Sequence, residues 1–409
     1  MEYLRSNIWE IKKSGALKSL GALLALFHLL QFYLWYDDGH LPLKFAQQDL
    51  PMCWSLMENC EWIKSIPFGV LQTAYYAYAS LMVLAALIWL VSDFVAFGYY
   101  MMLIGLGCGM ALYFQDLRLS SNEGYAIFLL SFAFLLVPSK HRVMRWLIVS
   151  FFAARGLSQA SPDWLSGTWY REHMNIPIKL AEWLAALSLL VQMIGSATLL
   201  FRDGRYFWSG WILLFLFQCS QLYMGELLGA STGLGVLLYA MFDEFELRKQ
   251  EREYIYQSFI RPEPSGVIGV CLLILFWTAQ LVPYLPVQRG STVKRILDVW
   301  ALHPEAAHED CRQRTFAQYK HRTEQIQVEP QIARQPAMLC NVYMRFLDLK
   351  ALCNQMRADP EFITLASVLD IRSYRDRKSY RAFEARDFCS DGLTFKKINE
   401  VKWTTTKDM

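Results

Sequence analysis

Hydrophobic runs alternate with short polar or basic stretches along the first two thirds of the chain. A helix needs about 20 apolar residues to cross a bilayer, and runs close to this length recur up to residue 285. This pattern is typical of a multi-pass membrane protein. We predict nine spans, at residues 19–36, 67–92, 95–114, 124–138, 146–158, 179–201, 206–223, 227–243 and 265–285.

The first run follows a basic N-terminal stretch, which is also a feature of signal peptides. The run ends in the bulky residues Phe32, Tyr33, Trp35 and Tyr36, and no small-residue cleavage site follows. We therefore expect an uncleaved first span with the N-terminus in the cytoplasm.

Basic clusters fix the orientation of the other spans. In the nine-span arrangement the clusters within 140–145, 202–205 and 248–261 all fall on the cytoplasmic side, as the positive-inside bias requires. An odd number of spans places the C-terminus on the other side. The fifth span is short and the eighth is rich in glycine, so eight spans with a cytoplasmic C-terminus is the alternative.

The composition changes after Pro286 to charged and polar residues. We predict a transmembrane bundle over 1–286 and a small extracytoplasmic α+β domain over 287–409. In this domain apolar spacing predicts a helix over 337–358. The segments 362–374 and 379–388 are rich in β-forming residues and predict a hairpin, and 393–401 predicts a last strand. The predicted fold class is an all-α membrane bundle with an α+β domain.

Nine cysteines divide by predicted location. Cys108, Cys219 and Cys271 fall in spans, where packing is their usual role. The others fall in even numbers in the first outer loop and the C-terminal domain, on the predicted oxidising side, and this favours disulfides over buried thiols. The disulfide candidates are Cys53, Cys60, Cys311, Cys340, Cys353 and Cys389.

Charge and spacing argue against several classes of function. The net charge of +3 gives no reason to expect nucleic-acid binding. His303 and His308 are five residues apart, which is not the spacing that places two ligands on one helical face, so we expect solvated residues and no metal there. No phosphate-binding loop, nucleotide fingerprint or Ser-His-Asp signature stands out.

Several polar residues in the spans and outer loops are candidates for function. Arg155 is either an anion contact in a cavity or a structural charge with a carboxylate partner, because an unpaired intramembrane charge is costly. Glu182 is a candidate pocket residue or that partner, and Glu226 is expected to be hydrated. His28 could relay protons or bond a neighbouring helix. His40, in the first outer loop, could act as an acid or base.

The stretch 151–167, FFAARGLSQASPDWLSG, ends a predicted span in a polar rim. It resembles a segment of the vitamin K-dependent γ-carboxylase-like family, also called the horizontally transferred transmembrane domain family. That segment has an aromatic-rich helix, a glycine, lysines, Asp-Trp and a second glycine. The first loop, with Asp37-Asp38-Gly39 and Leu41-Pro42, also resembles that of the family. The matching residues in the stretch are Phe151, Phe152, Ala153, Ala154, Gly156, Asp163, Trp164 and Gly167.

The chain departs from the family at the catalytic lysine pair, because Ser158 and Gln159 occupy those positions. In the carboxylases a lysine deprotonates vitamin K hydroquinone. A serine hydroxyl needs an activating partner and an amide does not titrate, so we expect neither γ-carboxylation nor this cofactor. The resemblance covers about residues 1–285. We expect a pocket on the outer side, with Arg155, Gly156, Asp163, Trp164, Gly167, Glu182 and His40 as candidate residues.

We therefore expect a membrane protein of the bacterial inner membrane, with a cytoplasmic N-terminus and a periplasmic or extracellular C-terminal domain. It would act on a secreted peptide or on a lipid- or quinone-like small molecule. The alternative is a non-catalytic scaffold or accessory protein whose C-terminal domain binds a partner. A transporter is less favoured, because few intramembrane charges mark a pathway.

Overall fold

The computed structural model describes residues 2–47, 65–91, 93–119, 121–160, 162–201, 204–249, 264–281, 309–328, 342–373, 379–390 and 393. The chain divides into two compact units, which we describe separately. One comprises Met1–Ser158 and Ala186–Leu302, and the other comprises Gln159–Ala185 and His303–Met409.

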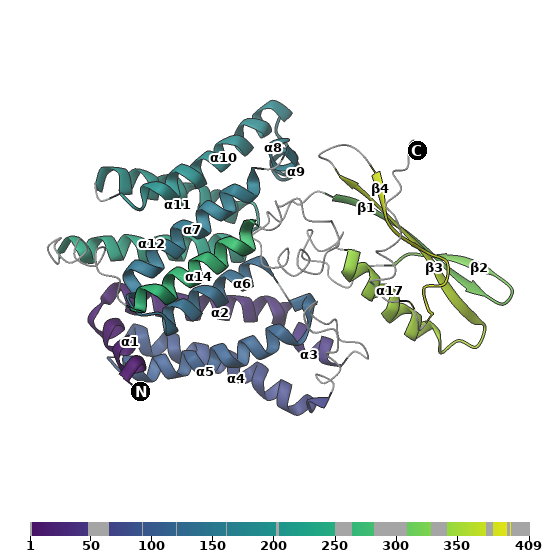
Figure 1. The fold of residues 1–409 in the computed structure, drawn as a ribbon, viewed down its shortest axis with the longest axis horizontal. Coiled ribbons are helices and arrows are strands. Elements are labelled where there is room, and N and C mark those ends of the chain that lie inside the picture. The colour runs from purple at the N-terminus through teal and green to yellow at the C-terminus, as the bar shows by residue number, and fades with distance from the viewer. Residues whose placement is uncertain are drawn as a thin grey trace. The chain divides into compact units, whose positions relative to one another are not determined.

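Among the described residues, nine helices occupy the positions of the nine predicted spans (Figure 1). They are α2 (Gly15–Asp37), α4 (Phe68–Val91), α5 (Val95–Gln115), α6 (Asn122–Leu136), α7 (Lys140–Gln159), α10 (Ile178–Thr198), α11 (Gly204–Tyr223), α12 (Leu227–Lys249) and α14 (Pro264–Leu281). Helix α7 begins six residues before its predicted span, because the basic cluster forms its first turns.

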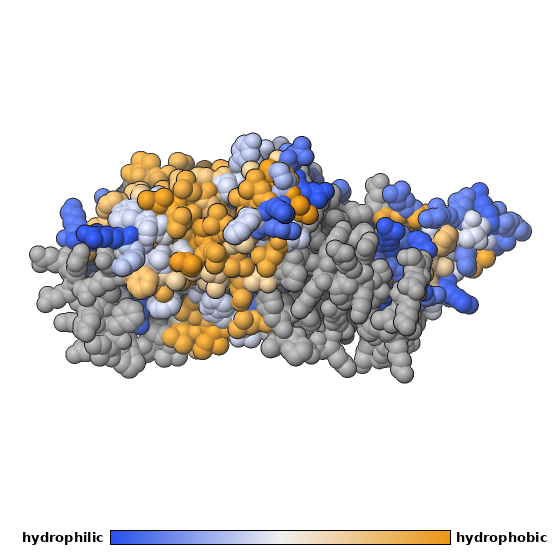
Figure 2. All heavy atoms as spheres, turned by 90° about the horizontal axis from the view of Figure 1, so that it is seen from above, coloured by the Kyte–Doolittle hydropathy of each residue, from blue (hydrophilic) through white to orange (hydrophobic). Residues whose placement is uncertain are grey.

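Four of these helices, α2, α4, α5 and α10, are long and apolar enough to cross a membrane. Two shorter apolar stretches, Glu123–Leu136 and Ile268–Thr278, lie in α6 and α14. Large apolar side chains such as Leu90, Trp183 and Leu216 are exposed on the helices. Hydrophobic residues dominate the face of the helical part seen in Figure 2. A surface of this kind is suited to lipid contact, so the chain is a membrane protein, and the number of nine spans stays a prediction.

Polar contacts gather helix ends at one end of the bundle, which we call the basic end. The Ser14 hydroxyl, at the start of α2, donates to Glu246 near the end of α12 at 2.7 Å. Lys18 of α2 pairs with Asp93, in the turn between α4 and α5. Arg145 of α7 pairs with Asp243 of α12. If successive helices run in alternating directions, the start of α2, the turn between α4 and α5, the start of α7 and the end of α12 fall at the same end of the bundle. The three contacts agree with this arrangement.

Close packing inside the bundle depends on small residues that face large ones. Trp89 of α4 lies against Gly21 of α2 and Gly98 of α5, and a Cβ atom at either glycine would overlap its ring. The indole Nε1 of Trp89 donates to the carbonyl of Val95. These glycines therefore allow α2, α4 and α5 to approach one another closely.

Among the described residues before the C-terminal domain, four short α-helices and the 3-10 helix Leu117–Leu119 lie outside the nine. Helix α1 (Glu2–Lys13) precedes α2, and α3 (Leu41–Ala46) follows it. Helices α8 (Pro162–Leu165) and α9 (Thr168–Met174) lie between α7 and α10. Pro162 is the first residue of α8, and Gly167 is the N-cap of α9.

The C-terminal part contains an antiparallel sheet with strand order β2-β1-β3-β4. The strands are β1 (Glu309–Tyr319), β2 (Thr323–Ile326), β3 (Phe362–Ser373) and β4 (Ser379–Ala385), and the helix is α17 (Val342–Met356). The predicted helix and the predicted hairpin of β3 and β4 are confirmed. Strands β1 and β2 were not predicted, because β1 is polar and has few β-branched residues. Most of the predicted strand at 393–401 lies outside the described residues.

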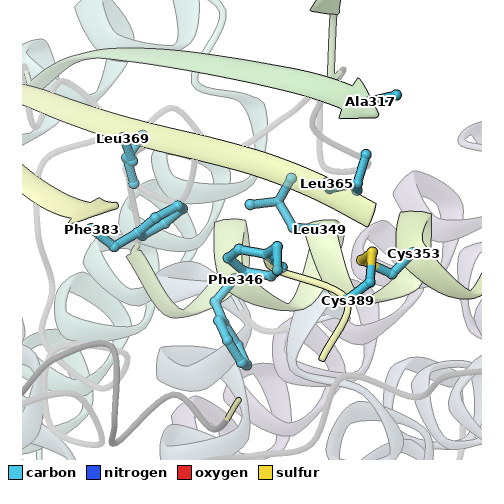
Figure 3. Packing of buried hydrophobic residues seen from close by; sticks show 9 residues of the cluster. Ala317, Phe346, Leu349, Cys353, Leu365, Leu369, Phe383 and Cys389 are labelled. Atoms are coloured by element: carbon cyan, nitrogen blue, oxygen red, sulfur yellow. A yellow bond between two sulfur atoms is a disulfide. The ribbon is translucent and has the colours of Figure 1, made fainter. Parts of the chain in front are cut away.

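The sheet and α17 share a hydrophobic core (Figure 3). Phe346 and Leu349 of α17 pack with Leu365 and Leu369 of β3 and with Phe383 of β4. In the same core, Cys353 of α17 is bonded to a cysteine that follows β4, Cys389, across a sequence separation of 36 residues. The disulfide therefore links the helix covalently to the segment after the last described strand.

Three of the disulfide candidates are disulfide-bonded, namely Cys353, Cys389 and Cys311. The other three, Cys53, Cys60 and Cys340, lie outside the described residues. The free cysteines of the described part are Cys108, Cys219 and Cys271, as predicted for the spans.

Candidate functional site

Arg155 of α7 lies in a buried polar cluster at the end of the bundle away from the basic end. Its guanidinium pairs with Glu226, in the turn before α12, and both side chains are less than a tenth exposed. Gln221 of α11, with its amide nitrogen turned toward Glu226, donates to the two carboxylate oxygens at 2.8 and 3.0 Å. Glu226 was expected to be hydrated, but it is buried because it neutralises Arg155.

Gly229 of α12 makes room for this cluster. A Cβ atom there would lie 3.3 Å from both terminal nitrogens of Arg155 and 3.3 Å from Cγ of Glu123, in the first turn of α6. Arg155 and the side chain of Glu123 therefore face the same point on α12. Four helices meet at this cluster, so it links α6, α7, α11 and α12.

Ser158 and Gln159, where the resemblance to the γ-carboxylase-like family would place lysines, supply no base. The Ser158 hydroxyl donates to the carbonyl of Arg155 one turn earlier, at 2.7 Å. Gln159 is buried and ends α7. Gly156 is packed against α10, where a Cβ atom would lie 3.1 Å from Cβ of Gln192. In this turn of α7 the side chains serve helix packing.

Two further residues of the stretch 151–167, Trp164 and Gly167, have structural roles in the second unit. Trp164 is buried, stacks on Trp169 and donates its indole N–H to the carbonyl of Ala185 at 3.3 Å. Its ring therefore packs inside the unit. Gly167 has φ +67°, and a Cβ atom there would lie 2.5 Å from the backbone nitrogen of Glu182. Only glycine fits this close approach to α10.

Two other predicted pocket residues, Glu182 and Asp163, lie in the second unit. The side chain of Glu182 is exposed on α10, and the carboxylate that pairs with Arg155 is that of Glu226. Asp163 lies in α8, and its side chain is outside the described residues.

His40 shows features of a ligand site. It has a left-handed backbone, with φ 57°, an uncommon conformation for a residue other than glycine. Its ring lies 4.5 Å from Tyr36 and 5.9 Å from Tyr75, measured between ring centroids. Its Nδ1 atom is buried without a hydrogen-bond partner, and so is the hydroxyl of Tyr75 on α4, whose side chain is fully buried.

Buried polar atoms without partners are rare in folded proteins, because the lost hydration is costly. His40 and Tyr75 come from different elements and face a common aromatic environment that includes Phe32, whose ring centroid lies 4.6 Å from that of Tyr75. Together they can offer hydrogen bonds to a small molecule that has both polar atoms and an apolar body.

His28, by contrast, is satisfied by its neighbours. Its Nδ1 atom lies 2.8 Å from the Tyr78 hydroxyl of α4, and its Nε2 atom lies 2.9 Å from the Ser131 hydroxyl of α6. The ring is fully buried. This arrangement supports the interpretation of His28 as a bond between helices.

The basic end holds two titratable groups before the apolar part of α7. The Lys140 ammonium donates to Asn7 at 2.8 Å, and its burial lowers its pKa to about 7, although Glu10 opposes this shift. Burial opposes the charged form of His141 as well, but the hydrogen bond and charge of Asp243 outweigh it and raise the pKa of His141.

A small cavity at this end is lined by Arg145, Ile148, Leu199, Phe207, Tyr239, Ala240 and Asp243. It is too narrow to hold a water molecule. Packed side chains therefore fill the bundle at this place.

Sequence reasoning missed Tyr75, Glu123 and Gln221. In a long apolar run, the sequence does not distinguish an aromatic or amide residue of a functional site from one that packs in the core. Tyr75 and Gln221 therefore could not be identified as candidates. Glu123, a carboxylate at the start of a predicted span, was a detectable signal. Comparison of the chain with protein-family models, with curated proteins and with solved structures gives no match.

Proposed function

We propose that this membrane protein acts on a secreted peptide or a lipid- or quinone-like small molecule at the end of the bundle that holds His40 and Tyr75. The proposal places that end on the outer face of a bacterial inner membrane and retains the resemblance to the γ-carboxylase-like family. It does not include γ-carboxylation, because Ser158 and Gln159 supply no base.

The observation that carries the proposal is the pair of unpartnered buried polar atoms, Nδ1 of His40 and the Tyr75 hydroxyl. A ligand with a hydrogen-bonding group would satisfy both atoms and would place its apolar part against Phe32 and Tyr36. The uncommon backbone of His40 supports this, because strained residues gather at functional sites.

The test is to identify what the protein holds when it is purified. Organic molecules extracted from the native chain are compared by mass spectrometry with those from His40→Ala/Tyr75→Phe and from His173→Ala. His173 is the matched control, since its Nδ1 atom is already bonded to the carbonyl of Trp169 at 2.8 Å.

We expect one species to be enriched on the native chain and the control, and to fall at least tenfold on the double variant. If all three preparations hold the same molecules in the same amounts, the His40 and Tyr75 site binds no ligand and the proposal fails.

The second candidate is a non-catalytic accessory protein whose C-terminal domain binds a partner. Two observations favour it: Arg155 is engaged by Glu226, and the sheet and α17 form a hydrophobic core of their own. On this interpretation the double variant His40→Ala/Tyr75→Phe supports full function in cells. Charge reversal of an exposed sheet residue such as Arg314 then abolishes function, although the protein is still inserted.

A further inference from the structure

Helix α1 has two different faces. Asn7 and Ile11 are buried against the bundle, where the Asn7 side chain accepts from Lys140. Glu10 accepts the backbone N–H of Lys140 at 2.6 Å, so its carboxylate is held at the bundle. The inner face therefore fixes α1 to the rest of the chain.

The outer face combines aromatic and basic side chains. Trp9 is 59% exposed, whereas Tyr3 lies on the inner face with its hydroxyl bonded to the carbonyl of Leu136 in α6. Arg5, Lys12 and Lys13 are also exposed, and the Lys13 ammonium lies 3.4 Å from the centroid of the Trp9 ring. A tryptophan beside basic residues is typical of helices that lie in the headgroup layer of a membrane.

The position of α1 agrees with this composition. Ser14 separates α1 from α2, and its hydroxyl accepts the N–H of Leu17 as the cap of α2. Helix α2 is apolar and long enough to span a bilayer. The start of α2 is therefore expected near the membrane surface, and α1, which precedes it at the basic end of the bundle (Figure 1), is expected near the same level.

We propose that the outer face of α1 binds the headgroups of anionic phospholipids. Arg5, Lys12 and Lys13 supply three positive charges, and Trp9 supplies an amphipathic ring that reaches the acyl boundary. Each basic residue near an anionic membrane surface contributes about 1 kcal/mol, or roughly a fivefold preference. The proposal applies to the membrane protein whatever molecule the His40 and Tyr75 site binds.

The test measures hydrogen–deuterium exchange of residues 2–13 in the full-length protein in two nanodiscs. One contains phosphatidylcholine alone, and the other contains equal parts of phosphatidylcholine and phosphatidylglycerol. The variants are Arg5→Gln/Lys12→Gln/Lys13→Gln and a matched control in the C-terminal domain, Lys320→Gln/Arg322→Gln/Arg386→Gln, which removes the same charge from exposed residues.

We expect exchange of α1 in the native chain and the control to be at least tenfold slower with phosphatidylglycerol, and the difference to shrink in high salt. In the triple variant of α1 the two nanodiscs should give the same exchange. Equal exchange of the native chain in both nanodiscs overturns the proposal without any variant. A difference that persists in the triple variant overturns it too, because the three basic residues would then not be responsible.

Discussion

At the residue scale, buried charges in this protein are held by specific partners. The Arg155 and Glu226 side chains face each other in a part of the bundle with little access to water. Lys18 and Asp93 also form an ion pair, but the Asp93 side chain is almost fully exposed. A buried pair is costly to break and an exposed pair contributes little, so the two pairs should respond differently to substitution.

We expect Glu226→Ala to destabilise the protein by about 3 kcal/mol, because it removes the carboxylate that neutralises the buried guanidinium of Arg155. The measurement is thermal unfolding in detergent, followed by aggregation or tryptophan fluorescence. Asp93→Asn serves as the control and should leave the unfolding temperature unchanged. Equal losses for the two variants would contradict this account of the Arg155 cluster.

Lys140 makes stability depend on pH. Its folded pKa is about 7, whereas an exposed lysine titrates at about 10.4. Between these values the unfolded chain holds the proton and the folded chain does not, so stability rises with pH in this window, by at most about 1.4 kcal/mol per pH unit.

The measurement is the unfolding temperature of the native chain and of Lys140→Met at pH 7 and pH 9.5. The unfolding temperature of the native chain should rise relative to that of Lys140→Met as the pH increases from 7 to 9.5. His141 acts in the opposite direction. Because its pKa is raised in the folded chain, it stabilises the fold at low pH, and this stabilisation is lost as the pH rises. A His141→Gln variant therefore separates the two groups. A constant difference between the native chain and Lys140→Met would show that Lys140 titrates normally.

At the element scale, glycines decide which helices can approach one another. Gly167 and Gly39 both have positive φ, of +67° and +79°. A Cβ atom at Gly39 would meet nothing within 4 Å, whereas at Gly167 it would meet the backbone of α10. A substitution at Gly39 therefore tests the cost of backbone strain alone, whereas one at Gly167 tests backbone strain and close packing together.

Gly167→Ala should cost about 3 kcal/mol or more, since the backbone of α10 cannot move aside as a flexible side chain can. Gly39→Ala should cost only the backbone penalty, about 1–2 kcal/mol. Limited proteolysis of the segment 159–185 in each purified variant gives the readout. If the two variants are cleaved equally fast, the approach of Gly167 to α10 is not tight.

At the scale of the whole molecule, the cysteines report on the proposed orientation. If the C-terminal domain lies outside the cytoplasm, Cys353 and Cys389 should resist a membrane-impermeant thiol reagent in intact cells until a reductant is added. Reduction should also lower the stability of this domain by about 2–4 kcal/mol, which speeds its proteolysis. Labelling that needs broken membranes and no reductant would place the domain in the cytoplasm and support eight spans.

The sequence by itself determined the class of the protein, the places of nine bundle helices, and the helix and hairpin of the C-terminal domain. Apolar runs of helical length, basic clusters between them and turn residues are local signals, and local signals can be read along one chain. They did not indicate β1, whose polar residues become strand only because β3 pairs with them along their length.

Only the tertiary structure decided which polar side chains meet. Arg155 and Glu226 are 71 residues apart, and no pattern in the sequence distinguishes Glu226 from Glu182 as the partner of Arg155. The packing around Gly229 brings the carboxylate of Glu226 to the guanidinium of Arg155. Packing also left the polar atoms of His40 and Tyr75 buried together, because the turn after α2 and the first part of α4 approach each other in space. Burial and pairing arise between distant segments, and the proposed ligand site rests on them.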